Sequence, residues 1–224
     1  MITIKKGHEP LSLTEFRSKG GEKFDDLDSQ TKEDIRSFLL KEQGFLCAYC
    51  MRRIGRDKND DGFYKDVKIE HVIPRSETQK SDDPTVRLLE IDYNNLVAVC
   101  DGLTEGMPHC DTSKENRVIK LHPCNINVEP TISYGLRDGK IISNNPHWND
   151  DINCEEKLNL NLSHIKINRI HALEGLKNAL KKDKNWSKSH LNRKLNHLEE
   201  VSHKNPYLGI LKYYLRKKIS SQNK

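Results

Sequence analysis

The sequence predicts an α+β protein, with short strands in the middle of the chain and helices that dominate its last third. Two observations predict this class. Residues 67–73 alternate apolar and polar side chains with the period of a strand. From residue 163 onward, apolar side chains recur at every third or fourth position, which is the period of an amphipathic helix. Segregation of strands and helices along a chain is typical of the α+β class.

The length and composition limit the size of the core. The chain has 224 residues, which corresponds to one or two domains. Hydrophobic residues make up 34% and charged residues 32%, so apolar side chains are scarcer and charges more frequent than in an average domain. We therefore expect a small core with much polar surface, or a core helped by a metal ion or a partner.

The first half of the chain contains one clear helix and two short strands. Residues 31–43 place apolar side chains at helical spacing, and Gly44 ends the pattern. A charged loop at residues 56–66 leads to the alternating strand, which Pro74 closes. Residues 96–100 form a second short apolar run, so this region predicts a pair of strands.

A second helix is predicted at residues 112–121. Thr112 and Glu115 have the spacing of a capping box, in which each side chain bonds a free backbone N–H of the first turn. The helix is therefore expected to begin at Asp111 or Thr112, and Pro123 stops it.

The remaining elements are a hairpin and three helical segments. Residues 132–143 are expected to form a hairpin around Asp138-Gly139. Helical spacing then continues from residue 163, at residues 191–198 and at residues 207–219. The last segment is basic and amphipathic.

Charge divides the chain. Residues 155–224 contain 16 Lys and Arg against 6 Asp and Glu, a net charge of +10, whereas the preceding residues carry a net −5. This basic segment favours contact with phosphate backbones or an acidic partner, and a solvated helical face explains it equally well. We expect an N-terminal helical extension that packs on the core at residues 1–46, a core at 47–150 and a basic helical region at 151–224.

Several classes of protein are excluded. The longest apolar run, residues 45–51, is far too short to span a bilayer. The first residues have no apolar segment of the secretory kind, which predicts a cytoplasmic protein without a membrane association. In that compartment six cysteines are more typical of metal binding than of disulfides. No Walker A segment occurs, so the chain lacks a P-loop of its own.

Four cysteines have the pattern of a zinc site. Cys47 and Cys50 are separated by two residues, as in half of a zinc-binding motif, and Cys100 and Cys110 supply a second half across a nine-residue loop. His109 is an alternative ligand. Four thiolates leave no position for water, which predicts a structural role for Zn²⁺. The other cysteines, Cys124 and Cys154, are expected to be buried apolar residues.

One motif is a false lead. The segment DKNDDG at residues 57–62 matches the first half of a calcium-binding EF-hand loop. The twelfth position of such a loop must be a carboxylate, and here it is Lys68. Calcium binding is not expected.

Glu70 and His71 form a candidate acid–base pair at the end of the predicted strand. His can act as a general base near neutral pH, and a carboxylate is a suitable Mg²⁺ ligand. Neighbouring strand residues point to opposite faces, so both reach one site only if the strand ends or bends there. A packed, non-functional His is the alternative for such a strand.

The order of these motifs resembles the HNH endonucleases. The chain has CxxC, an acidic residue followed by His71, Asn95-Leu96, a third cysteine and then Cys110-Asp111-x-x-Lys114. Many HNH proteins have Asn or His in place of Asp111. Further segments, LLKEQG at 39–44, LNLNL at 158–162 and PYLG at 206–209, are similar to the PtuB-type HNH nucleases of Septu and retron-linked antiphage defence.

This resemblance implies a zinc-stapled ββα-metal core that cuts nucleic acid, DNA or RNA. His71 would deprotonate the attacking water, and Asn95 would position His71 or brace its loop. A catalytic Mg²⁺ or Mn²⁺ would be held by Glu70 and Asp111. Phosphate contacts are expected at the remaining candidates, which are Arg75, Lys114 and Arg117.

The resemblance also implies partners. These are a PtuA-type ABC ATPase and, in some systems, a retron RNA–DNA hybrid with its reverse transcriptase; the nuclease would be the toxic effector. An alternative of another class is a zinc-stapled module that binds nucleic acid or protein without cutting. A thiol oxidoreductase built on the CxxC segment is a third reading, and it leaves Cys100 and Cys110 without a use.

Overall fold

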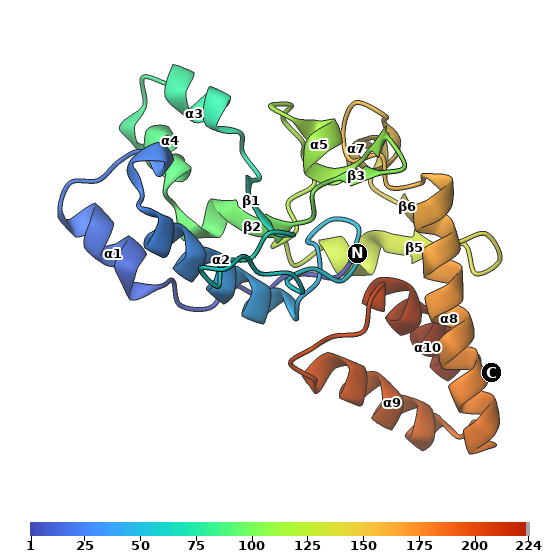
Figure 1. The fold of residues 1–224 in the computed structure, drawn as a ribbon. Helices are drawn as coiled ribbons and strands as arrows, with labels where there is room; N and C mark the ends of the chain where they lie inside the picture. The colour runs from blue at the N-terminus through green and yellow to red at the C-terminus, as the bar shows by residue number, and fades with distance from the viewer. Residues whose placement is uncertain (223–224) are drawn as a thin grey trace.

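The computed structural model describes residues 1–222, and in that range three small antiparallel hairpins lie among helices (Figure 1). The hairpins are separate two-stranded sheets, which confirms the α+β class. They pair β1 (Lys68–His71) with β2 (Leu96–Val99), β3 (Leu103–Thr104) with β4 (Met107–Pro108), and β5 (Ile132–Tyr134) with β6 (Ile141–Ser143).

Helices account for most of the regular structure. The α-helices of the described residues are α1 (Leu11–Ser18), α2 (Ser29–Gln43), α3 (Arg75–Lys80), α4 (Pro84–Arg87), α5 (Cys110–Lys114), α6 (Val128–Thr131), α7 (Pro146–Asn153), α8 (Ser163–Asp183), α9 (Lys188–Glu200) and α10 (Leu208–Ser221). Three 3₁₀ turns, Phe24–Asp26, Leu88–Glu90 and Tyr93–Asn95, precede α2 and β2. None of the helices in residues 1–222 combines the length and apolar character needed to cross a membrane.

The helix predicted at residues 31–43 is confirmed as α2. Asp28 precedes it, and its side chain accepts a hydrogen bond from the backbone N–H of Thr31, as an N-cap does. Gly44 ends the helix in the left-handed conformation, with φ at 63°, which a residue without Cβ adopts at no steric cost. Ile35 and Leu39 are fully buried, as the apolar spacing predicts, whereas Phe38 of the same pattern is exposed.

The helix predicted at residues 112–121 is wrong in both bounds. The observed α5 begins at Cys110 and ends after five residues at Lys114, because Glu115 has a φ of 49°. Thr112 does not cap the helix, since its hydroxyl donates instead to the carbonyl of Asp101. The chain beyond Glu115 is irregular, and the buried Asp151 carboxylate accepts its backbone N–H groups at residues 120 and 121.

The hairpin predicted at residues 132–143 is confirmed as β5 and β6. Gly139 has a φ of 71° and its N–H donates to the carbonyl of Gly135, which closes the turn. Arg169 of α8 is fully buried and donates to the carbonyls of Gly139 and Leu160, at 3.0 and 2.8 Å. An arginine on the apolar stripe of α8 thus ties that helix to the hairpin.

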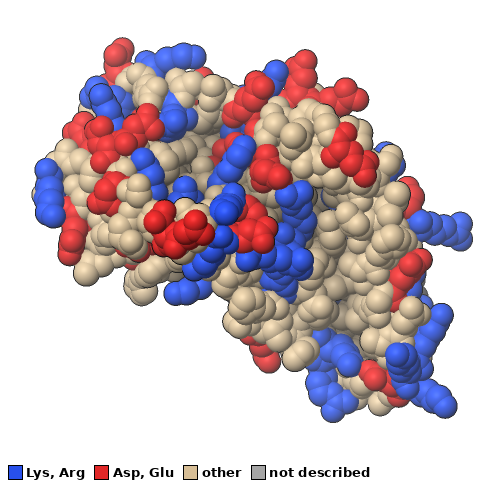
Figure 2. All heavy atoms as spheres, viewed as in Figure 1, with Lys and Arg blue, Asp and Glu red and all other residues tan. Residues whose placement is uncertain are grey.

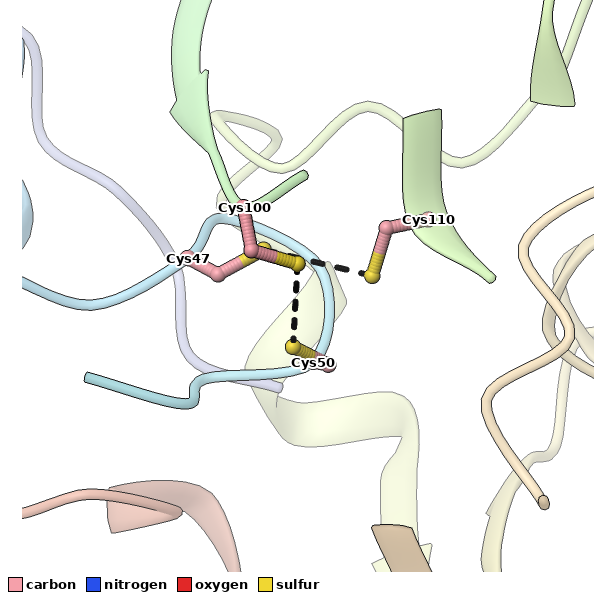
Figure 3. Close-up of side chains that lie close together, drawn as sticks. All are labelled: Cys47, Cys50, Cys100 and Cys110. Atoms are coloured by element: carbon pink, nitrogen blue, oxygen red, sulfur yellow. Dashed lines mark hydrogen bonds between the residues drawn. The ribbon is translucent and has the colours of Figure 1, made fainter. Parts of the chain in front are cut away.

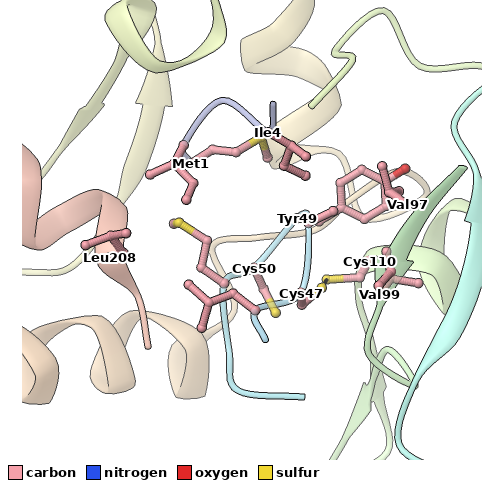
Figure 4. Close-up of a cluster of buried hydrophobic side chains, with 14 of the residues drawn as sticks. Met1, Ile4, Cys47, Tyr49, Cys50, Val97, Val99, Cys110 and Leu208 are labelled. Atoms are coloured by element: carbon pink, nitrogen blue, oxygen red, sulfur yellow. Dashed lines mark hydrogen bonds between the residues drawn. The ribbon is translucent and has the colours of Figure 1, made fainter. Parts of the chain in front are cut away.

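Residues far apart in the sequence share one buried cluster (Figure 4). Met1 and Ile4 lie in it together with the CxxC turn, with Val97 of β2 and with Leu208 of α10. The last third also bonds the middle of the chain, since the N–H of Tyr207 donates to the carbonyl of Met51 at 2.8 Å.

The predicted domain boundary falls on a helix. Residues 146–153 form α7, which packs against β6 rather than forming an extended linker. The division at residues 46 and 150 stays a prediction, and the shared cluster runs across both positions. On the surface, Lys and Arg gather around the lower ends of α8 and α9, while both signs of charge intermingle elsewhere on the visible face (Figure 2).

Candidate functional site

Two groups of polar side chains adjoin the hairpin formed by β1 and β2. The antiparallel register places Glu70 opposite Val97 and His71 opposite Leu96. The third cysteine follows directly after β2, and the fourth is the first residue of α5. The hairpin and α5 therefore carry both the cysteine cluster and the acid–base candidates.

The four predicted cysteines converge (Figure 3). Their sulfur atoms all lie within 4.8 Å of one another, and the cluster is buried. The Sγ atoms of Cys47 and Cys110 are 3.9 Å apart, as are those of Cys50 and Cys100. A tetrahedral zinc with bonds of about 2.3 Å sets its sulfurs about 3.8 Å apart, so the cluster has the dimensions of a structural zinc site.

Local backbone geometry turns the cysteines inward. The N–H of Met51 donates to the carbonyl of Cys47 at 3.0 Å, and Met51 has a φ of 63°. This tight turn brings Cys47 and Cys50 to one side. Cys110 has a φ of 52°, and its N–H donates to the carbonyl of Leu158, so its direction is fixed by a segment of the last third.

The chemistry of the cluster fits zinc. Burial raises the pKa of Cys110 well above its ordinary value, because a lone thiolate is poorly solvated there. A divalent cation would reverse this balance by bonding the thiolates directly. His109 lies beside the cluster: its Nδ1 is 3.1 Å from the sulfur of Cys110 and its Nε2 is 3.1 Å from the hydroxyl of Thr104. The four sulfurs converge without it.

Glu70 is buried against a lysine. Its Oε1 lies 2.8 Å from the Nζ of Lys114, and the side chains are 8% and 0% exposed. The hydroxyl of Tyr49, inside the CxxC turn, donates to the same oxygen at 3.3 Å. Burial raises the pKa of Glu70 to about 8; the ammonium of Lys114 opposes this shift and the carboxylate of Asp111 adds to it.

His71 is the last residue of β1, and it is held by a backbone carbonyl. Its Nε2 lies 2.9 Å from the carbonyl oxygen of Glu90, and the ring of Phe24 meets it edge-on at 4.8 Å. Burial lowers the pKa of His71 to about 4, so the ring is neutral near pH 7. The other nitrogen, Nδ1, makes no hydrogen bond within residues 1–222 and is not enclosed.

Asn95 braces the loop that follows β1. Its Oδ1 accepts from the N–H of Ile73 at 2.8 Å, and its Nδ2 donates to the carbonyls of Ile73 and Leu89 at 3.0 and 2.9 Å. The backbone carbonyl of Asn95 also accepts from the N–H of Val72. Of the two predicted functions of Asn95, these contacts correspond to bracing the loop; no hydrogen bond from its side chain to the His71 ring occurs in the described residues.

Asp111 lies on α5 and is paired with a lysine as well. Its Oδ2 is 3.0 Å from the Nζ of Lys68, which is half exposed. Both candidate ligands of a catalytic metal, Glu70 and Asp111, are therefore already bonded to lysine side chains. As folded, this donor set does not fit Mg²⁺ or Mn²⁺. In the described part of the chain, the cysteines are the one group of three or more His, Cys, Asp or Glu with metal-site geometry.

The basic candidates occupy different environments. Arg75 is partly exposed and bonds Asp25 at 2.6 Å, and Arg117 is half exposed near Glu115. Lys114 lies neither on a solvated helix face nor on a surface open to phosphate, because it is fully buried. The short α5 turns this charged side chain inward.

Sequence reasoning missed three groups that surround the candidates. These are Lys68, Glu90 and Tyr49, which contact Asp111, His71 and Glu70. Tyr49 lies between two cysteines, and this position could have placed it near the metal site. No local pattern around Glu90 predicts that its carbonyl bonds a histidine 19 residues away.

No protein-family model matches the chain, and no curated protein matches it either. The geometry alone offers two kinds of chemistry. The cluster Cys47, Cys50, Cys100 and Cys110 can hold a structural zinc. The second ring nitrogen of His71, whose partner nitrogen is bonded to a carbonyl, is the candidate proton acceptor, and burial lowers its pKa to about 4.

Proposed function

We propose that the chain is an HNH-type endonuclease that hydrolyses phosphodiester bonds of nucleic acid. One observation carries the proposal. Strand β1, which pairs with β2, ends in Glu70-His71, and the short helix α5 next to it begins with a cysteine of the four-cysteine cluster. The order of motifs in the sequence predicts this arrangement, in which a zinc site holds two paired strands and a helix around a histidine. The same site would serve DNA or RNA, since the reaction requires only a phosphodiester.

His71 has two of the properties that a general base needs, a ring that is neutral near pH 7 and one nitrogen fixed by a backbone carbonyl, while burial makes it a weaker base than a free imidazole. The Glu90 carbonyl holds the proton on Nε2, which leaves the lone pair on Nδ1. Nδ1 would take a proton from a water molecule while the water oxygen bonds to phosphorus and the bond from phosphorus to the leaving oxygen breaks. The leaving oxygen would take a proton from solvent. Asn95 supports this by holding the loop directly after His71.

The proposal includes a partner and a cellular role. Its support is the similarity of three segments outside the metal motif to PtuB-type nucleases, including Leu158–Leu162, whose carbonyls bond Cys110 and Arg169. On this basis the chain is the effector of an antiphage system that works with a separate ABC-type ATPase in the cytoplasm. Copurification of the chain with the products of neighbouring genes tests the partner, and a preparation that binds none of them contradicts it.

A cleavage assay tests the reaction. Purified protein is incubated with labelled single- and double-stranded DNA and RNA, with and without 5 mM divalent metal as a rough starting concentration. The His71→Ala variant should lose activity by about 10²–10⁴-fold, which is what removal of a general base costs. His197→Ala is the matched control, since His197 is exposed on α9. Equal activity in both variants contradicts the proposal.

A second function has one observation in its favour. Because Glu70 and Asp111 are already paired with lysines, the site could serve only to hold the fold together, in a zinc-stapled module that binds without cutting. The exposed Lys181, Lys182 and Lys184 at the end of α8 would then contact phosphates. Binding that persists in the His71→Ala variant, with no cleavage by the unmodified protein on any substrate, favours this module.

A further inference from the structure

Lys114 is a buried cation in the position where the proposed nuclease would need a metal. Resting on that proposed function, we infer that the Lys114 ammonium is an internal cation that occupies the candidate divalent-metal site, and that a divalent ion binds only when Lys114 leaves Glu70. The site is thereby closed to metal in its resting state. The argument rests on three features of the geometry.

The first feature is the set of atoms around the ammonium. The Nζ of Lys114 lies 2.8 Å from Oε1 of Glu70, 3.3 Å from the carbonyl oxygen of His71 and 3.4 Å from the carbonyl oxygen of Glu115. One carboxylate and two backbone carbonyls are oxygen ligands of the kind that Mg²⁺ and Mn²⁺ take. The pocket is thus built for a cation, and a lysine fills it.

The second feature is enclosure. Lys114 is fully buried, Glu70 is 8% exposed at its side chain, and the Tyr49 hydroxyl covers the carboxylate from the CxxC turn. A metal ion cannot simply join this pair, because two cations would then share one carboxylate in a poorly solvated position. Metal and ammonium therefore exclude each other.

The third feature is the difference between the two lysines. Asp111, the other candidate ligand, is paired with Lys68, which is half exposed and can turn into water without leaving a buried charge behind. Lys114 has no such freedom, and it is carried by α5, a helix of five residues. Displacing Lys114 requires a movement of α5 or of its last residues. Metal entry is consequently coupled to the position of this helix.

The experiment measures Mn²⁺ binding to the full-length, zinc-loaded protein by electron paramagnetic resonance. Lys114→Met keeps the length of the side chain and removes its charge, so it should bind Mn²⁺ at least about tenfold more tightly than the unmodified protein. Lys68→Met is the matched control and should change the affinity by less than about threefold. Equal or weaker Mn²⁺ binding by the Lys114→Met variant overturns the inference.

A second measurement needs no variant. Reductive dimethylation with formaldehyde and cyanoborohydride, followed by peptide mass spectrometry, reports whether the Lys114 amine is accessible. Lys114 should be protected without metal and become modified as Mn²⁺ is added, over the concentrations at which Mn²⁺ binds. Protection that persists at saturating Mn²⁺ overturns the inference, even if the Lys114→Met variant fails to fold.

These outcomes are separate from the fate of the proposed nuclease. Cleavage is assayed on the same samples, and neither Mn²⁺ binding nor lysine modification depends on it. Tighter Mn²⁺ binding by Lys114→Met, without cleavage of any nucleic acid, supports the inference about Lys114 and contradicts the nuclease proposal. Metal-dependent cleavage, with Lys114 protected from dimethylation at every Mn²⁺ concentration, contradicts the inference about Lys114 and supports the nuclease proposal.

Discussion

The cysteine cluster and the Glu70 pocket lie on the same hairpin and the same short helix, yet they balance charge in opposite ways. The cluster gathers four thiols whose sulfur atoms lie within 4.8 Å of one another. The pocket pairs each carboxylate with a lysine, Glu70 with Lys114 and Asp111 with Lys68. The cysteine cluster would take its positive charge from a bound metal ion, whereas the Glu70 pocket already contains lysine side chains.

This difference has a physical consequence for stability. A group of thiolates without metal is destabilising, so metal binding and folding are one equilibrium there. A buried carboxyl group bonded to a lysine is satisfied without metal, and removing either partner leaves a buried polar group without its hydrogen bond. We expect variants of the two sites to respond differently to chelators and pH.

The largest effect is expected from the cluster. Cys50→Ser should lose the zinc and most of the free energy of metal binding, which is on the order of 10 kcal/mol for a structural site. Zinc content by mass spectrometry and the melting temperature measure this; a fall in Tm of at least about 10 °C is expected. Cys124→Ser, a half-buried cysteine outside the cluster, is the control. Equal zinc content in the two variants would remove the basis of the comparison.

The Glu70 pocket should give the next largest effect. Lys114→Met removes the partner of a buried carboxyl group whose pKa is already raised to about 8, so Glu70 should take up a proton, and the lost hydrogen bonds should lower the free energy of unfolding by up to about 3 kcal/mol. Combining it with Glu70→Gln should recover part of this loss, because neither member of the pair is then left without the partner it is packed against. Urea denaturation of the single and double variants measures the coupling. Strict additivity of the two changes would mean that the pair does not act as a unit.

A pH dependence should distinguish His71 from both sites. Burial lowers its pKa from the ordinary value of 6.5 to about 4, so the unfolded chain binds a proton more readily than the folded protein between these values. Stability therefore falls as pH drops from about 6.5 to 4, by roughly 3 kcal/mol in total. His71→Gln should lack this contribution. Parallel pH profiles of the two proteins in chemical denaturation would contradict it.

The smallest effect is expected at Asn95. Asn95→Ala removes two donated hydrogen bonds and one accepted bond, and it leaves the N–H of Ile73 without its partner, at a cost of about 1–3 kcal/mol. If the nuclease proposal holds, cleavage should fall while zinc content stays the same. Asn94→Ala, at the exposed neighbouring position, is the control. A loss of zinc in Asn95→Ala would show that the two sites are not independent.

The cysteine cluster could be predicted from the sequence, because a CxxC pair and two further cysteines supply the four thiols that a structural zinc site takes. α2 and the β5–β6 hairpin were also predictable, since Gly44 and Gly139 mark their turns with the conformation that glycine favours. In these segments local chemistry and the final fold agree.

The Glu70 pocket could not be predicted in the same way. Thr112 and Glu115 satisfy a local capping rule, but the Thr112 hydroxyl bonds the Asp101 carbonyl and the helix ends at Lys114. The environment of Lys114 is set by Tyr49 and Glu70, which lie 65 and 44 residues earlier in the chain. Whether a lysine faces water or a buried carboxylate is decided by such long-range packing, which no local pattern encodes.

Segments of the last third of the chain form hydrogen bonds with residues in and next to the cysteine cluster, and these segments are synthesised after the cysteines. The N–H of Cys110 bonds the carbonyl of Leu158, and the carbonyl of Met51 accepts from Tyr207. All four cysteines therefore leave the ribosome well before the segments that cover them. A zinc ion that bound the nascent cluster would be covered by those segments in the finished protein, so its release should be slow and should speed up whenever the C-terminal contacts are loosened.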